Sequence, residues 1–173
     1  MKLFKKVSAM VVSLLMALAM VVPVAAANPT ITVKNIATDE NVTLSYLKVV
    51  KQDKTTKTGW AFVSDEVTKI FKEEYKKNDA QAILASLANS AAHSKALARL
   101  GNLNGFTKFT DNAGRKTEVD GAGLYVVKVV DNSNKYTYNV MAAPINFEYA
   151  NNPATLKNAE LAVKRSETKL TKT

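Results

Sequence analysis

Cysteine is absent from the 173-residue chain, so the sequence excludes disulfides, thiol nucleophiles and cysteine-ligated metal sites. Histidine occurs once, as His93, and the serines nearest to it, Ser90 and Ser94, lie in the same alanine-rich segment. Nucleophilic catalysis needs a nucleophile, a base and an orienting group held together, which one histidine beside serines of its own segment does not provide. We therefore expect no enzymatic activity, no catalytic, cofactor-binding or metal-binding residues, and a surface or partly packed His93.

Arginine is also scarce, although the chain carries a formal net charge of +9. Its only arginines, Arg99, Arg115 and Arg165, are far apart, and its lysines are mixed with acidic residues, as in residues 69–74. Proteins that bind nucleic acids carry basic clusters, often with interleaved aromatic residues on which bases stack. Neither pattern occurs here, so we expect no nucleic-acid partner and interpret the basic charge as a solvated surface.

The N-terminus has the order of regions found in a secretory signal peptide. Three lysines and no acidic residue occupy residues 1–6, a largely apolar run covers residues 7–22, and Ala25, Ala26 and Ala27 supply small residues. The run is shorter than the roughly 20 apolar residues that a stable membrane span needs. We predict a signal peptide over residues 1–27 rather than an uncleaved anchor, and a protein that is secreted or displayed at the cell surface, with no membrane contact after cleavage.

Most of the 146 residues that follow show the two-residue alternation of half-buried strands. The alternation changes phase within residues 42–50, which indicates a β-bulge or burial on both faces. Residues 124–130 are apolar on both faces apart from Lys128, which predicts a buried central strand. Residues 106–110 and 115–119 flank a turn sequence and predict a hairpin. Further strands are expected over residues 30–36, 59–63, 136–149 and 158–165.

A helical insert interrupts the strands over about residues 64–100. Ser64 predicts the N-cap of a first helix, and Asn78 or Asp79 predicts the cap of a second helix that runs to about Leu100. Strands, two helices and then strands again predict a mainly β sandwich with an inserted two-helix segment.

One domain of this kind accounts for residues 28–165, and residues 166–173 are polar. We interpret these last residues as a tail or a truncated linker.

Three short segments, taken together with their order along the sequence, carry a resemblance to a known protein family. They are GAGLYVV at residues 121–127, YTYNVMAAPI at residues 136–145 and the opening TITV at residues 30–33. Together with the signal peptide, they resemble the N-terminal domain of Gram-positive pilus backbone subunits, the sortase-assembled fimbrial proteins with isopeptide-forming domains. The resemblance implies an immunoglobulin-like sandwich with a helical excursion, a structural role in a surface fibre, and other pilin subunits and a sortase as partners.

Members of this family usually continue into further sandwich domains and end in an LPxTG-type sorting signal, an apolar span and a basic tail. The sequence shows none of these after residue 165. We therefore expect a truncated subunit, a fragment of a longer subunit, or a free secreted relative.

The resemblance also implies two kinds of lysine chemistry. In the family, a sortase joins the C-terminal threonine of one subunit to a lysine of the next, often in a Tyr-Pro-Lys context near the end of this domain. Lys164 occupies the comparable place, without the tyrosine and proline, and is the candidate acceptor. Family domains also form Lys–Asn isopeptide bonds promoted by a buried carboxylate, and the candidates here are Lys34 or Lys48 with Asn139.

Two functions from different classes fit these patterns. The first is a structural subunit of a surface pilus or fimbria, cross-linked by a sortase. The second is a secreted binding module or adhesin that recognises a host or cell-wall ligand through the helical insert and the loops. A covalent ladder formed with a sortase would favour the first function, and a discrete soluble ligand would favour the second.

Overall fold

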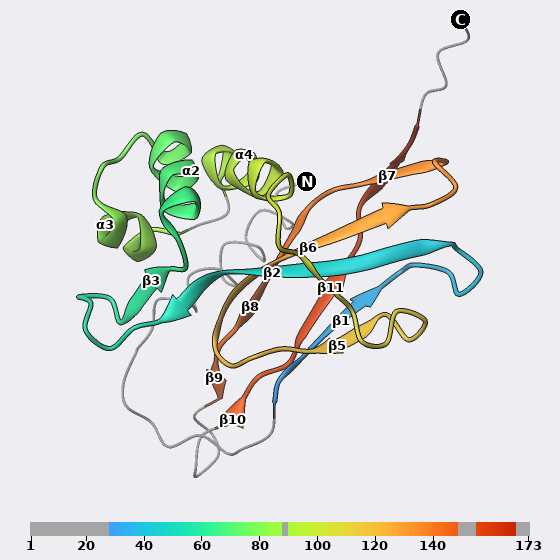
Figure 1. The fold of residues 1–173 in the computed structure, drawn as a ribbon, viewed down its shortest axis with the longest axis horizontal. Coiled ribbons are helices and arrows are strands. Elements are labelled where there is room, and N and C mark those ends of the chain that lie inside the picture. Colours follow the sequence, from blue (N-terminus) through green and yellow to red (C-terminus); the bar gives the residue numbers. More distant parts are fainter. Residues whose placement is uncertain (1–27, 88–89, 149–154, 169–173) are drawn as a thin grey trace, which may run out of the picture.

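The computed structural model describes residues 28–87, 90–148 and 155–168, and these form three layers (Figure 1). A large sheet lies in the middle, helices pack on one of its faces, and a small sheet packs on the other. This arrangement confirms the predicted mainly β sandwich with a helical insert. The predicted signal peptide, residues 1–27, lies outside the described residues.

The large sheet contains β2 (Val42–Gln52), β3 (Trp60–Phe62), β4 (Thr107–Lys108), β6 (Gly123–Asp131), β7 (Tyr136–Tyr138), β8 (Met141–Ile145) and β12 (Arg165–Glu167). Its main path runs β12-β7-β6-β2-β3, with β8 paired to β6 and β4 paired to β2. Every one of these pairs is antiparallel. The register of β2 against β6 shifts between Lys48 and Val50, which confirms a bulge, the first of the two explanations offered for the change of phase.

The small sheet contains β1 (Thr30–Lys34), β5 (Lys116–Glu118) and β11 (Ala159–Ala162) in the order β11-β1-β5. β1 pairs with β11 in parallel and with β5 antiparallel. A short pair formed by β9 (Phe147–Glu148) and β10 (Thr155–Leu156) lies at one end of the molecule (Figure 1).

The strand β6 separates the two halves of the core. Leu124 and Val126 belong to the apolar cluster beneath the helices, whereas Tyr125 and Val127 belong to the cluster between the sheets. All four are at most 1% exposed, so the prediction of a buried central strand is confirmed, although Val130 near its end is 46% exposed. The alternation of β-strand side chains explains how one apolar run fills both cores.

The sequence just before β6 forms a tight corner. The Tyr125 hydroxyl donates hydrogen bonds to the carbonyl oxygens of Asp120 and Gly121, at 2.6 and 2.9 Å. Immunoglobulin-type sandwiches use a tyrosine near the start of a strand in the same way. Gly123 has a φ of +157°, and a Cβ placed there would lie 2.2 Å from the Val50 carbonyl oxygen. Glycine is therefore required where β6 passes β2 so closely.

The insert contains three helices, which are α2 (Asp65–Tyr75), α3 (Ala80–Ala85) and α4 (Ala91–Leu100). Ser64 caps α2 as predicted, and Asp79 caps α3. The prediction of one helix from about residue 78 to Leu100 is wrong. The Ser86 hydroxyl donates to backbone carbonyls where α3 ends, and the Ser90 hydroxyl accepts the His93 amide where α4 begins. Serine side chains that bond the backbone favour helix ends over helix interiors.

The predicted hairpin at residues 106–119 is also wrong in its pairing. Asp111 and Lys116 form the expected bridge across the turn, but β4 pairs with β2 and β5 pairs with β1. This segment therefore crosses from the large sheet to the small sheet. Asn112 ties the turn to β2, since its side chain accepts the Leu44 amide and donates to the Val42 carbonyl oxygen.

Candidate functional site

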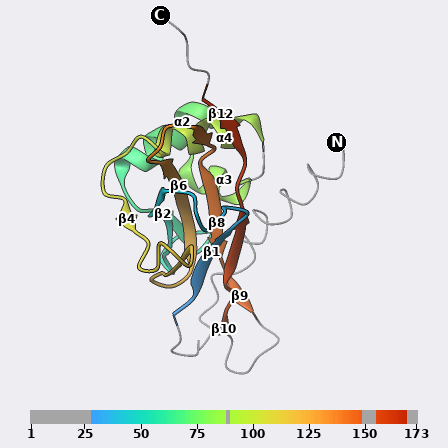
Figure 2. The same cartoon turned by 90° about the vertical axis from the view of Figure 1, so that its right-hand side faces the viewer.

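Lys164 lies on a short crossover between the two sheets. The sequence predicted one strand over residues 158–165, but β11 ends at Ala162 in the small sheet and β12 begins at Arg165 in the large sheet. The prediction of a single strand is therefore wrong, and residues 165–167, in part the expected tail, pair with β7. Figure 2 shows β12 at the end of the molecule opposite β9 and β10.

The backbone holds Lys164 on both sides of the crossover. The Val163 amide donates to the Lys34 carbonyl oxygen at 3.4 Å, and the Asn139 amide donates to the Lys164 carbonyl oxygen at 3.0 Å. The side chain of Lys164 is exposed. Lys164 thus combines an anchored backbone with a side chain at the surface.

Four side chains meet next to the crossover, and we call Glu40, Tyr136, Tyr138 and Arg165 the Glu40 cluster. Glu40 precedes β2, and its carboxylate accepts hydrogen bonds from the Tyr138 hydroxyl and from Nη1 of Arg165. The guanidinium of Arg165 also lies 3.9 Å from the centre of the Tyr136 ring, which is a cation–π contact. The cluster joins β7, β12 and the loop before β2.

The electrostatics of the Glu40 cluster favour an ionised carboxylate. The hydrogen bond from Tyr138 and then that from Arg165 hold the pKa of Glu40 below its usual value. Burial, followed by the hydrogen bond to Glu40, raises the pKa of Tyr138. Hydrogen bonds to an ionised group are shorter and stronger than neutral ones, so this cluster is a firm link at physiological pH.

The turn between β6 and β7 lies beside the Glu40 cluster and depends on Asp131. Its carboxylate accepts the hydroxyl and amide of Ser133 at 2.6 and 2.9 Å, and the amides of Lys135 and Tyr136 at 2.9 and 2.8 Å. These hydrogen bonds lower the pKa of Asp131 to about 2, and the bond from the Ser133 hydroxyl contributes most to the shift. Asp131 and Glu40 line a polar hollow at this end of the molecule.

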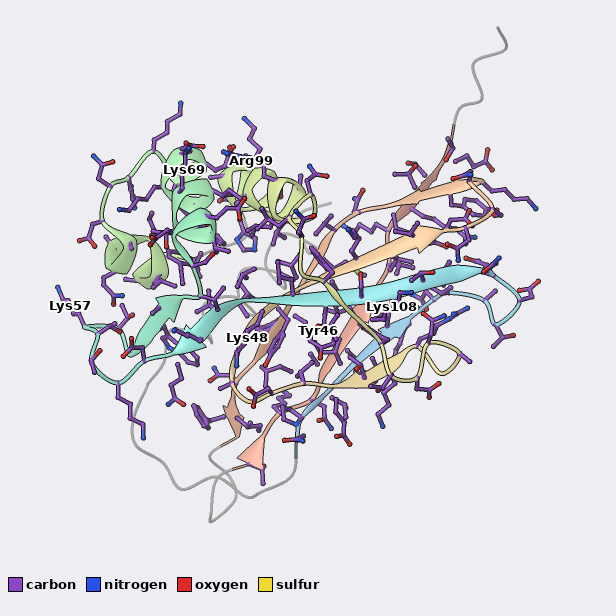
Figure 3. The ribbon with its side chains drawn as sticks, in the orientation of Figure 1. Tyr46, Lys48, Lys57, Lys69, Arg99 and Lys108 are labelled. Atoms are coloured by element: carbon purple, nitrogen blue, oxygen red, sulfur yellow. The ribbon has the colours of Figure 1, made fainter. Side chains whose placement is uncertain are left out.

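The three isopeptide candidates occupy different surroundings. Lys34 forms an ion pair with Glu160 at 2.6 Å on the exposed edge of the small sheet. Lys48, labelled on β2 in Figure 3, donates to the Asp120 carbonyl oxygen, and burial lowers its pKa. Asn139 is exposed. Within residues 28–87, 90–148 and 155–168, no hydrogen bond joins either lysine to the Asn139 side chain. An isopeptide bond here stays a prediction.

His93 is buried between α2 and α4, at 2% exposure, so the expectation of a surface or partly packed residue is wrong. Its Nδ1 lies 3.3 Å from the Tyr75 hydroxyl, and burial lowers its pKa to about 4. Arg99, labelled on α4 in Figure 3, joins the same two helices through Glu73 and Glu74 at 2.7 and 2.9 Å. These contacts make the helical insert a packed layer.

Across the described part of the chain, no group of three or more histidine, aspartate and glutamate side chains is arranged to hold a metal ion. Nor does any helix there have the length and apolar character that crossing a membrane requires. A small apolar hollow opens between β8 and β11 and is lined in part by Pro144, Phe147 and Leu161.

Sequence reasoning proposed Lys164 but missed the Glu40 cluster around it. Tyr136 and Tyr138 alternate along a predicted strand, which placed them on one face, and Arg165 follows the candidate lysine directly. Glu40 had no such signal, because it lies 125 residues from Arg165 along the chain. The partnership arises only through the sheet register.

Comparisons with known proteins point to one fold. No protein-family model matches the sequence, and no curated protein matches it. A structure with a similar fold is the T6 backbone pilin of serotype M6 Streptococcus pyogenes, described as a modular three-domain structure decorated with variable loops and extensions. The TM-score is 0.51 at 14% sequence identity, over 83% of this chain and 29% of that pilin chain. This chain therefore has a pilin-like fold and spans less than a third of that pilin.

Proposed function

We propose that this chain is the N-terminal domain of a pilus backbone subunit, a structural protein exported to the cell surface and without catalytic turnover. The observation that carries the proposal is the pilin-like fold over 83% of the chain. The predicted signal peptide agrees with export, and N-terminal sequencing of the exported protein should start at Ala27 or Asn28. A sequence that started at Met1 would contradict export with cleavage.

In this proposal Lys164 is the acceptor through which a sortase joins the subunit to its neighbour. The sortase holds the partner's C-terminal threonine as a thioester. The Lys164 amine, after losing a proton to a base of the sortase, attacks the thioester carbonyl carbon. A C–N bond forms as the C–S bond breaks, and the sortase thiolate leaves and is reprotonated. The exposed side chain on an anchored backbone suits this attack.

The experiment combines the protein with its cognate sortase and a partner that bears a sorting signal, and maps the linked lysine by mass spectrometry. We expect linkage at Lys164 that disappears in Lys164→Arg. The matched control is Lys157→Arg, which changes another exposed lysine near the start of β11. Undiminished linkage in Lys164→Arg would remove Lys164 as acceptor, and no linkage in the wild type would refute sortase assembly.

The isopeptide prediction has its own measurement. Joining Lys34 or Lys48 to Asn139 would form a C–N bond between the lysine amine and the asparagine carbonyl carbon and release one ammonia. The intact mass of the purified protein therefore decides whether the bond exists. An intact mass equal to the mass calculated from the amino-acid sequence, with no ammonia lost, would exclude the isopeptide bond.

The alternative function is a secreted binding module that recognises a host or cell-wall ligand. The apolar hollow between β8 and β11 is the observation that favours it, since ligand sites are mostly concave and apolar. Two observations together would favour this function over the pilus subunit. A soluble ligand would bind the wild type and bind Leu161→Lys more weakly, and a sortase would not link the protein.

A further inference from the structure

We infer that Glu40, Tyr138 and Arg165 are positioning residues that present Lys164 for linkage and concentrate the reaction on this lysine. This inference rests on the proposed function. Lys164 itself would react. The three neighbours would act indirectly, by fixing the position of the Lys164 backbone.

The contacts around Arg165 fix the residue next to the acceptor from two directions. Its backbone pairs with Tyr138 of β7, and its side chain bonds the carboxylate of Glu40. The Tyr138 hydroxyl bonds the same carboxylate, so strand pairing and side chains restrain the same point. The Asn139 amide bonds the Lys164 carbonyl oxygen and the Val163 amide bonds the Lys34 carbonyl oxygen, so the backbone of the acceptor is held after and before its Cα.

An anchored backbone matters because a sortase thioester must meet the amine in one geometry. A lysine on a mobile segment loses more conformational freedom when it is captured than a lysine on a fixed strand end. Lys157, Lys169 and Lys172 lie near Lys164 in the sequence and are natural competitors. The Lys157 backbone is held as well, since its amide donates to the Asn146 carbonyl oxygen at 2.8 Å, but the Glu40 cluster adjoins Lys164 and not Lys157. The side-chain bonds of the cluster would favour Lys164 over Lys157 without any contact to the reacting atoms.

The test compares Glu40→Gln with Glu160→Gln in the sortase linkage assay. Both variants remove one carboxylate from an ion pair, but Glu160 pairs with Lys34 on the exposed edge of β11, outside the Glu40 cluster. The measurements are the rate of linkage at Lys164 and the ratio of linkage at Lys164 to linkage at the other lysines. Global destabilisation would not change that ratio in protein that stays folded at the assay temperature.

We expect Glu40→Gln to lower the rate at Lys164 about tenfold and to shift linkage to other lysines, since misplacement of a reacting group by about 1 Å can lower a rate roughly 100-fold. Glu160→Gln should behave like the wild type. Should Glu40→Gln fail to fold, Tyr138→Phe leaves the ion pair of Glu40 with Arg165 in place and should give a smaller shift in the same direction. It removes the hydrogen bond from Tyr138 to Glu40 and the long one, 3.4 Å, from Nη1 of Arg165 to the Tyr138 hydroxyl.

Two results would overturn the inference and they are distinguishable. A wild-type ratio in both Glu40→Gln and Tyr138→Phe, with linkage still at Lys164, would show that the cluster only stabilises the fold and would leave the proposed function intact. Absence of linkage at any lysine of the wild type would overturn the proposed function and the positioning role together.

Discussion

Replacing His93 tests whether the helical insert is packed as the structure shows. His93 is 2% exposed, and burial lowers its pKa from 6.5 to about 4. Its Nε2 is buried without a hydrogen-bond partner in the described part of the chain. A protonated ring would place a poorly compensated charge inside this layer, so the folded protein keeps the ring neutral.

The pKa of His93 predicts how stability changes with pH. The unfolded chain binds a proton near pH 6.5, whereas the folded protein binds it only near pH 4. Because the folded pKa is depressed, the stabilisation is present above pH 6.5 and is lost as the pH falls toward 4. The full shift corresponds to about 3 kcal/mol, of which about 2 kcal/mol is lost between neutral pH and about pH 5. Glu40 and Asp131 have lowered pKa values and stay ionised in this window.

Urea denaturation at neutral pH and at about pH 5 measures the free energy of unfolding for the wild type, His93→Leu and Ser94→Ala. Ser94 is an exposed neighbour on α4 and serves as the matched control. We expect the wild type and Ser94→Ala to lose about 2 kcal/mol on acidification, and His93→Leu to lose much less. Equal losses in all three proteins would refute a buried, neutral His93.

Three other substitutions probe the sandwich. Gly123→Ala should lower the free energy of unfolding by about 2 kcal/mol or more because its Cβ would meet the Val50 carbonyl. Urea denaturation compares it with Gly121→Ala, which carries the strain of a φ of +71° but meets no atom within 4 Å, and equal effects would contradict the clash with Val50. Asp131→Asn should lower the melting temperature at neutral pH. It should also abolish the part of the acid-induced loss of stability that Asp131 causes in the wild type as the pH falls toward 2. An unchanged melting curve would count against this role of Asp131. Val127→Asp should cost about 4 kcal/mol or more, and a melting temperature within a degree or two of the wild type would mean that β6 is not central.

The fold class could be predicted because it depends on local patterns. The side-chain period changes from two to the helical spacing near Ser64 and returns to two after the insert, and these changes mark strands and helices directly. The cap at Ser64, the central strand β6 and the bulge in β2 were predicted for the same reason, since each depends on residues close together in the chain.

Strand pairing could not be predicted in the same way. The segments of β4 and β5 are compatible with a hairpin, yet each pairs with a different sheet. The strand expected over residues 158–165 divides between the sheets as well. Alternation shows which side chains share a face, but not which strand lies alongside, because pairing is chosen by the packing of both cores.

The candidate site likewise combines features set by short stretches of sequence with features set by contacts between distant residues. The sequence by itself determined the alternation, the caps and, through a resemblance, the choice of Lys164, because these reside in short stretches of chain. Only the tertiary structure decided that Lys164 lies on a crossover between sheets and that Glu40 reaches Arg165, 125 residues away. A contact between such distant residues exists only once the sheets have formed in register, so no local pattern encodes it.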